Sequence, residues 1–371
     1  MADQTPASPD QIEGAPHPRE TPQVFGQTAS EAAFLEAFAT DRMHHAWLLT
    51  GPKGIGKATL AWRMARFLLA TPDVAEDDMF GAPSLPETLD ISPEHPVARR
   101  LMAGSDPGLV SVTRSVNDST GRMRNDIVVD DIRRLNGFFQ MSAAEGGRRV
   151  VIVDSADEMN VNAANALLKM LEEPPERAIL LLISHQPMRL LPTIRSRCRT
   201  LRLSPLGPED MASALAQAGV EPANADGLTA LAGGSVGEAI RLTLLDGLKI
   251  YAEVIGLLAS LPNLDRARSL ALAEAAAQRG AEDKLDLLFS LIETALARLA
   301  RTGATGHTPV PEAVPGEGEI LARLSGHPRA ARAWAETAQS ALARVRHGRA
   351  VNLDPAALVL DTLFKLQETA A

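Results

Sequence analysis

The chain has 371 residues, a formal net charge of −9 and an aromatic content of only 4%. These values argue against a general nucleic-acid coat protein, which needs a basic groove and stacking rings, so we expect any DNA contact to be local or shared with partners. A single cysteine, Cys198, excludes a disulfide framework and a cysteine-built zinc site, so we expect no bound metal. The sequence has no apolar run at its N-terminus and none of membrane-spanning length, which predicts a cytoplasmic protein without a membrane partner.

The first half of the chain has the pattern of an α/β domain. Residues 1–22 contain five prolines among polar residues and are predicted to be a disordered leader. Short apolar runs then alternate with helical patterns up to residue 205, as in a parallel sheet with flanking helices. An acidic, proline-rich insertion at 71–96, whose role the sequence does not indicate, interrupts this region. The expected strands are 46–49, 127–129, 150–153 and 179–183.

The first of these strands runs into a phosphate-binding loop, Gly51-Pro52-Lys53-Gly54-Ile55-Gly56-Lys57-Ala58-Thr59. Its glycines let backbone N–H groups turn toward an anion, and Lys57 would reach the β- and γ-phosphates. The residue after this lysine normally supplies a hydroxyl for Mg²⁺, but here it is Ala58. Thr59 is a candidate phosphate contact. We therefore expect ATP or ADP to bind only weakly and largely without a metal.

A second strand, 150–153, ends in Asp154, the candidate residue for orienting Mg²⁺ and its waters. Hydrolysing enzymes of this layout carry a glutamate directly after the aspartate, whereas this chain has Ser155, which is a poor general base near neutral pH. Asp157 and Glu158 follow, and we expect them to be solvated at a helix start. The pattern predicts little or no independent ATPase activity.

After Leu203 the sequence predicts helices only. A compact helical piece near 206–244 contains the turn Gly233-Gly234-Ser235, and a larger helical piece follows from about residue 246. A Pro/Gly-rich loop of unassigned role interrupts the larger piece at 303–318. Its apolar stripe indicates either an assembly surface, which we predict, or an ordinary bundle core. The stripe consists of Ile250, Val254, Leu257 and Leu258.

Two further motifs carry a family resemblance. Leu167-Leu168-Lys169-Met170-Leu171-Glu172-Glu173-Pro174-Pro175 is a leucine-striped helix stopped by two prolines, and Ser196-Arg197-Cys198 follows the next predicted strand. With these motifs, and with His44-His45-Ala46 before the loop, the chain resembles the clamp-loader family of AAA+ proteins. The resemblance is good in the α/β part, adequate in the small helical piece and weak in the C-terminal third.

This resemblance implies three domains and a set of partners. It divides the chain into an AAA+ α/β module at 23–205, a helical lid at 206–245 and an all-α collar for oligomerisation at 246–371. It implies a hetero-pentamer with gamma/tau-type and delta-type subunits of a DNA polymerase III holoenzyme, a nucleotidyltransferase assembly. Such a complex places a sliding clamp on primed DNA.

The resemblance also implies that Arg197 enters the ATP site of the adjacent subunit as an arginine finger. Hydrolysing members carry a lid arginine where this chain has Gly237, and many relatives have a zinc module that is missing here. We therefore expect a stator that donates Arg197. One alternative is an ATP-hydrolysing gamma/tau-like subunit. Another is a P-loop phosphotransferase, which would leave the helical C-terminal third without a purpose.

Overall fold

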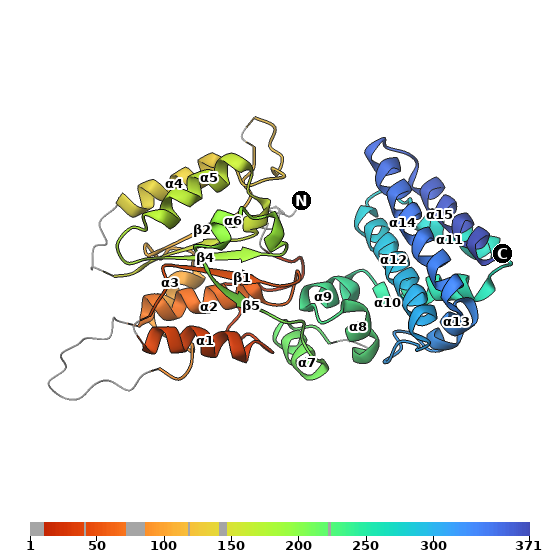
Figure 1. Cartoon of the computed structure of the whole chain (residues 1–371), viewed down its shortest axis with the longest axis horizontal. Helices are drawn as coiled ribbons and strands as arrows, with labels where there is room; N and C mark the ends of the chain where they lie inside the picture. The colour runs from red at the N-terminus through yellow and green to blue at the C-terminus, as the bar shows by residue number, and fades with distance from the viewer. Residues whose placement is uncertain (1–10, 41, 72–85, 118, 141–146, 222–223) are drawn as a thin grey trace. The chain divides into compact units, whose positions relative to one another are not determined.

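The computed structural model describes residues 11–40, 42–71, 86–117, 119–140, 147–221 and 224–371 (Figure 1). It divides into two compact units. The first consists of Met1–Gly219 with Ser235–Gly237, and the second of Val220–Gly234 with Glu238–Ala371. No helix in the described ranges is both long enough and apolar enough to span a bilayer.

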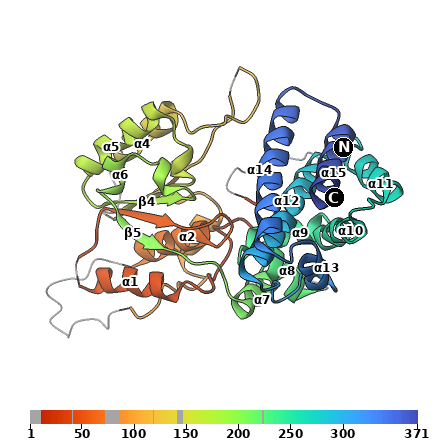
Figure 2. The same cartoon turned by 45° about the vertical axis from the view of Figure 1, so that its right-hand side comes forward.

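The first unit is built on a five-stranded parallel sheet in the order β2-β3-β4-β1-β5. Helices α1 and α2 lie on one face, and α4 and α5 lie on the other (Figures 1 and 2). Because parallel strands end at one edge, the residues that follow β1, β3 and β4 are brought together there. The elements are α1 (Thr28–Ala39), β1 (Ala46–Thr50), α2 (Lys57–Ala70), α3 (Pro96–Met102), β2 (Leu109–Val112), α4 (Val129–Gln140), β3 (Arg149–Val153), α5 (Val161–Glu172), β4 (Ala178–Ser184), α6 (Pro192–Arg195), β5 (Arg199–Arg202) and α7 (Pro208–Gln217).

Three of the four predicted strands are confirmed, and the fourth is wrong. Ile127 forms only an isolated bridge with Met159, and α4 already begins at Val129. The reason is local: the Asp131 carboxylate accepts the Val128 N–H at 3.0 Å and so turns the chain into the helix. The sheet gains two strands that the sequence did not predict, β2 and β5, which are four residues long and only partly buried.

The leader prediction is wrong for residues 11–22, which pack on α2. The Arg66 guanidinium donates to the Arg19 carbonyl at 2.7 Å, and the buried His17 ring meets Trp62 edge to face at 5.7 Å. Arginines of α2 thus satisfy backbone carbonyls of a segment whose composition suggests disorder. Residues 1–10 lie outside the described residues, as do residues 72–85 of the predicted insertion.

The second unit contains only helices among its described residues, as predicted (Figure 1). The unit boundary falls inside the segment predicted as a lid, because α7 belongs to the first unit and α8 to the second. The apolar stripe is bundle core rather than open surface: Val254, Leu257 and Leu258 are all buried. The elements are α8 (Ala225–Ala232), α9 (Val236–Leu244), α10 (Gly247–Ser260), α11 (Arg266–Ala276), α12 (Glu282–Thr305), α13 (Glu317–Leu324), α14 (Pro328–Ala350) and α15 (Pro355–Ala370).

A buried ionic cluster joins several helices of this unit. Glu317 of α13 has no exposed surface, and its carboxylate lies 2.7 Å from Nε of Arg298 in α12. The same carboxylate accepts the Tyr251 hydroxyl of α10 at 2.6 Å and the Ala313 N–H at 2.7 Å. Arg298 also donates to the Ala230 carbonyl of α8 at 3.3 Å. The cluster therefore ties α8, α10, α12 and α13 together.

Candidate functional site

The predicted phosphate-binding loop connects β1 to α2. Gly51, Gly54 and Gly56 have φ values of +145°, +77° and +94°, which L side chains rarely adopt. A Cβ on Gly51 would also lie 2.6 Å from the Leu203 carbonyl oxygen, so only glycine fits there. Ile55 is buried beneath the loop, and Pro52 and Lys53 are exposed. Ala58 and Thr59 are half-buried in the first turn of α2, whose N-terminus suits an anion.

Lys57 is bound by the loop that precedes it. Its side chain is 3% exposed, and its ammonium donates to the Gly51 carbonyl at 2.7 Å and to the Pro52 carbonyl. Burial lowers the pKa of Lys57 to about 8, while the charges of Asp154 and Asp157 oppose this shift. The lysine thus stays largely protonated at neutral pH, and its ammonium group holds the loop together through the carbonyls of Gly51 and Pro52.

Polar residues at the ends of β3 and β4 lie beside this lysine. Asp157 is buried, and its two carboxylate oxygens accept the N–H groups of His185 and Gln186, each at 3.0 Å. The His185 ring lies 3.3 Å from the Ser155 hydroxyl. Burial, helped by the charge on Lys57, lowers the pKa of His185 to about 4, so this ring is neutral at pH 7. The loop, Asp154 and this polar group lie near one another at the edge where the parallel strands end.

Sequence reasoning missed part of this group. Asp157 was expected to be solvated, but it is buried because it anchors the backbone that follows β4. Ser184, which is fully buried at the end of β4, and His185 were not predicted. A signal for both existed, because they follow the apolar run 179–183 in the same way that Asp154 follows 150–153.

The N-terminus of α9, together with Ser235 before it, packs directly against the phosphate-binding loop. The Gly237 N–H donates to the Gly54 carbonyl at 3.1 Å. A Cβ on Gly54 would lie 2.3 Å from the Ser235 hydroxyl oxygen, and a Cβ on Gly237 would lie 3.2 Å from the Gly54 Cα and 2.4 Å from Ile12 Cδ1. The absence of a side chain at position 237 therefore allows backbone to touch backbone at the point where the resemblance implies a cation.

Arg197 lies apart from this group, between α6 and β5. Its guanidinium is 2.8 Å from a carboxylate oxygen of Glu172, donates to the Thr193 carbonyl at 3.1 Å, and belongs to a side chain that is 36% exposed. Because Glu172 ends α5, this ion pair joins the two motifs of the family resemblance. Among the described residues, none of the hydrogen bonds or ion pairs of Arg197 involves the loop 51–59. Burial raises the pKa of the neighbouring Cys198 to about 12, so its thiol is unreactive.

In the described parts of the chain, no group of three or more His, Cys, Asp or Glu side chains is arranged to hold an ion. Ala58 offers no oxygen at the position where the loop would bind Mg²⁺. The loop residues thus fit a phosphate group better than they fit its metal.

Residues 26–207 match the model of the family described as DNA polymerase III, delta subunit. DNA polymerase III subunit delta' of Pseudomonas aeruginosa is 42% identical over 204 residues, 53% of this chain and 55% of that protein. The Bacillus subtilis delta' subunit is 32% identical over 206 residues, 56% of each chain. Escherichia coli subunit tau is 28% identical over 298 residues, 75% of this chain and 41% of that one. The matches thus span about half the length of these relatives.

Two solved structures are similar at lower identity. A gamma-subunit-related protein of Thermotoga maritima is 18% identical, with a TM-score of 0.44, and the match covers 91% of this chain and 100% of that one. The RuvB Holliday junction branch migration motor of Thermotoga maritima is 17% identical, with a TM-score of 0.37, and the match covers 83% of this chain and 86% of that one. At these scores neither likeness bears on function.

Proposed function

Through residues 26–207 this chain belongs to the DNA polymerase III clamp-loader family, and on that premise we propose that it is a loader subunit of the delta-prime type. In this proposal it is a stator that supplies Arg197 to the ATP site of a neighbouring subunit. Its partners are gamma/tau-type and delta-type subunits in a hetero-pentamer, and the complex loads a sliding clamp on primed DNA.

The observation that carries the proposal is the way Arg197 is held. Glu172 and the Thr193 carbonyl orient its guanidinium, yet more than a third of the side chain stays exposed. A surface ion pair of this kind contributes only about 0–1 kcal/mol, so Arg197 can exchange Glu172 for a phosphate at little cost. A planar guanidinium can also bridge two phosphate oxygens. The geometry supports a cation that is preoriented and still available.

The chain's own loop supports the second half of the proposal, the lack of independent turnover. Lys57 and the loop amides can hold a phosphate of ATP or ADP weakly. The side chain of Ala58 supplies no metal ligand, and Ser155 cannot replace the glutamate that serves as general base in hydrolysing enzymes. Gly237 adds no charge and instead seats the start of α9 against Gly54. We propose that nucleotide bound here is not hydrolysed at a useful rate.

Reconstituted loader complexes test the finger. Arg197→Ala should leave the chain folded and assembled while lowering the ATPase rate that clamp and DNA stimulate. A trans-acting arginine is worth about 10³–10⁵ in rate at its own site, although other sites in the ring would limit the total loss. Arg197→Lys should rescue poorly. Arg202→Ala, an exposed arginine on the neighbouring strand β5, is the matched control and should change little.

Lys57→Ala in the same assay tests the loop. It should reduce the rate less than Arg197→Ala, because this chain's own site is not expected to turn over. An unchanged rate with Arg197→Ala together with a collapse with Lys57→Ala would reverse the assigned roles. Rapid single-turnover hydrolysis by the isolated chain would favour the gamma/tau-like alternative.

A further inference from the structure

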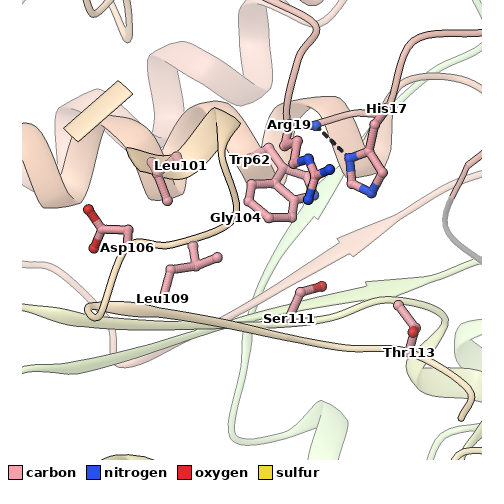
Figure 3. A pocket seen from close by; sticks show the side chains of 9 residues that line it. All are labelled: His17, Arg19, Trp62, Leu101, Gly104, Asp106, Leu109, Ser111 and Thr113. Carbon is pink, nitrogen blue, oxygen red and sulfur yellow. Dashed lines mark hydrogen bonds between the residues drawn. The ribbon is translucent and has the colours of Figure 1, made fainter. Parts of the chain in front are cut away.

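A separate pocket, with no lining residue from the loop 51–59, lies between α2 and the edge strand β2 (Figure 3). Its volume is about 240 Å³. Sites for drug-sized ligands and cofactors occupy roughly 300–1,000 Å³. The pocket is therefore too small for a nucleotide and suits a group the size of one amino acid.

One end of the pocket gathers hydrogen-bond donors. Figure 3 shows Ser111 of β2 and Arg19 among the residues that line this part of the pocket. The Ser111 hydroxyl oxygen is buried and has no hydrogen-bond partner in the part of the chain that the structure describes. Within the described ranges, the Arg19 guanidinium has one ion pair, with Glu20 at 3.5 Å, and both side chains are partly exposed. A buried hydroxyl without a partner is destabilising, and a ligand atom that accepts its hydrogen bond would remove this cost.

The backbone of β2 adds another donor beside that end. The Val150 N–H donates to the Gly108 carbonyl and the Asp154 N–H to the Val112 carbonyl, so alternate residues of β2 face β3. The N–H and C=O of Ser111 therefore face away from the sheet, at its open edge. An extended peptide terminus could pair with them.

The other end of the pocket is apolar or already neutralised. Leu101 is buried, and Leu109 points from β2 into the same space (Figure 3). Asp106 also lines this end, but Arg100 Nε and the Gly108 N–H each hold its carboxylate at 2.9 Å. No uncompensated charge among these described residues therefore calls for a cation, and Arg19 remains the charge that a ligand would meet.

We propose that this pocket binds the carboxylate of a small apolar acid. The carboxylate accepts hydrogen bonds from Arg19 and Ser111, and the alkyl group lies against Leu101 and Leu109. The same chemistry is offered by a free branched carboxylic acid and by the C-terminal leucine of a peptide. The site is independent of the loader function and of the phosphate-binding loop.

Calorimetric titration of the full-length chain tests the proposal with four probes. These are 4-methylpentanoate, its neutral amide, an octapeptide ending in a free leucine, and the same peptide amidated. At least one carboxylate probe should bind, and its amide should bind at least about tenfold more weakly, because the charge-assisted bonds are lost. Binding by the free acid alone identifies a small molecule as the source, and tighter binding by the free-terminus peptide identifies a chain end. Both results support the site.

Three variants locate the binding. Arg19→Gln should weaken the carboxylate probe about tenfold or more, and Ser111→Ala should weaken it without loss of stability, because it removes only an unpartnered hydroxyl. The control is Arg99→Gln, which should bind as the parent does. Arg99 is an exposed arginine of nearby α3 and forms an ion pair with Glu94. Equal binding of acid and amide, unchanged binding by Arg19→Gln, or no binding by any probe would overturn the proposal.

Discussion

The buried cluster around Glu317 allows a quantitative test of what holds the second unit together. Glu317→Gln keeps the shape of the side chain but removes its charge. Arg298, itself buried, would then face no carboxylate. Removing the charge of one partner of a buried ion pair lowers the free energy of unfolding by about 3–5 kcal/mol, because the remaining charge stays desolvated and unpaired. We expect the free energy of unfolding of this unit to fall by about that amount.

The double variant Arg298→Met/Glu317→Leu separates the charge from the packing. It removes both ions and keeps apolar volume, so it should be less destabilised than Glu317→Gln. Tyr251→Phe should cost about 1–3 kcal/mol, because it deletes a hydrogen bond to a charged group. The pKa of Tyr251 is raised by burial and by the charge of Glu317, so the hydroxyl remains a donor throughout the working pH range.

Hydrogen exchange of the α12 amides is the suitable assay, because it reports on the second unit alone and a two-unit chain need not unfold in one step. Far-UV circular dichroism controls for misfolding. A loss below about 1 kcal/mol in Glu317→Gln, or a double variant as unstable as the single one, would refute the reasoning that a desolvated Arg298 sets the cost.

Two further predictions concern the loop. The folded-state pKa of Lys57 is about 8 and the ordinary value is 10.5, so between these values the unfolded chain binds the extra proton, and the contribution of Lys57 to stability should rise as pH rises from 8 to 10.5. This contribution amounts to up to about 3 kcal/mol, and Lys57→Met should remove it. Melting curves of the parent and the variant at about pH 7.5, 9 and 10 test this. If the dependence of stability on pH is the same in both, another group causes it. Gly237→Ala should cost about 1–3 kcal/mol, because its Cβ meets Gly54 and Ile12. Gly207→Ala, where a Cβ meets nothing within 4 Å, is the control, and equal melting temperatures would contradict the close contact.

The sequence predicted those parts of the fold that have a strong local pattern. The central strands are continuous apolar runs because both of their faces are buried, and three of them were found. The edge strands β2 and β5 were not predicted, because Ser111 in β2 and the arginines of β5 interrupt such an apolar run. The 127–129 segment is apolar but is not a strand, since a side-chain cap from Asp131 decides its conformation.

In the candidate site, too, some features could be predicted from the sequence and others could not. Its loop and Asp154 could be placed together, because the topology of a parallel sheet fixes where strand ends meet. The anchoring role of Asp157 and the contact of Gly237 with Gly54 could not be predicted. Both depend on backbone groups that are distant in sequence, and such groups leave no periodic pattern in the side chains. The partner of Arg197, Glu172, lay inside a recognised motif, but only the folded chain shows that the two meet.

The contact between Gly54 and Gly237 has a consequence for substitutions in the site. A hydroxyl at position 58 or an acid at position 155 could each be introduced by substituting one side chain. An arginine at position 237 is different, because its first side-chain carbon already collides with Ile12 and crowds the loop. Either the Ile12 side chain or the start of α9 would have to shift to accommodate such a side chain. The close contact thus makes a cation at position 237 harder to introduce than either of the other two groups.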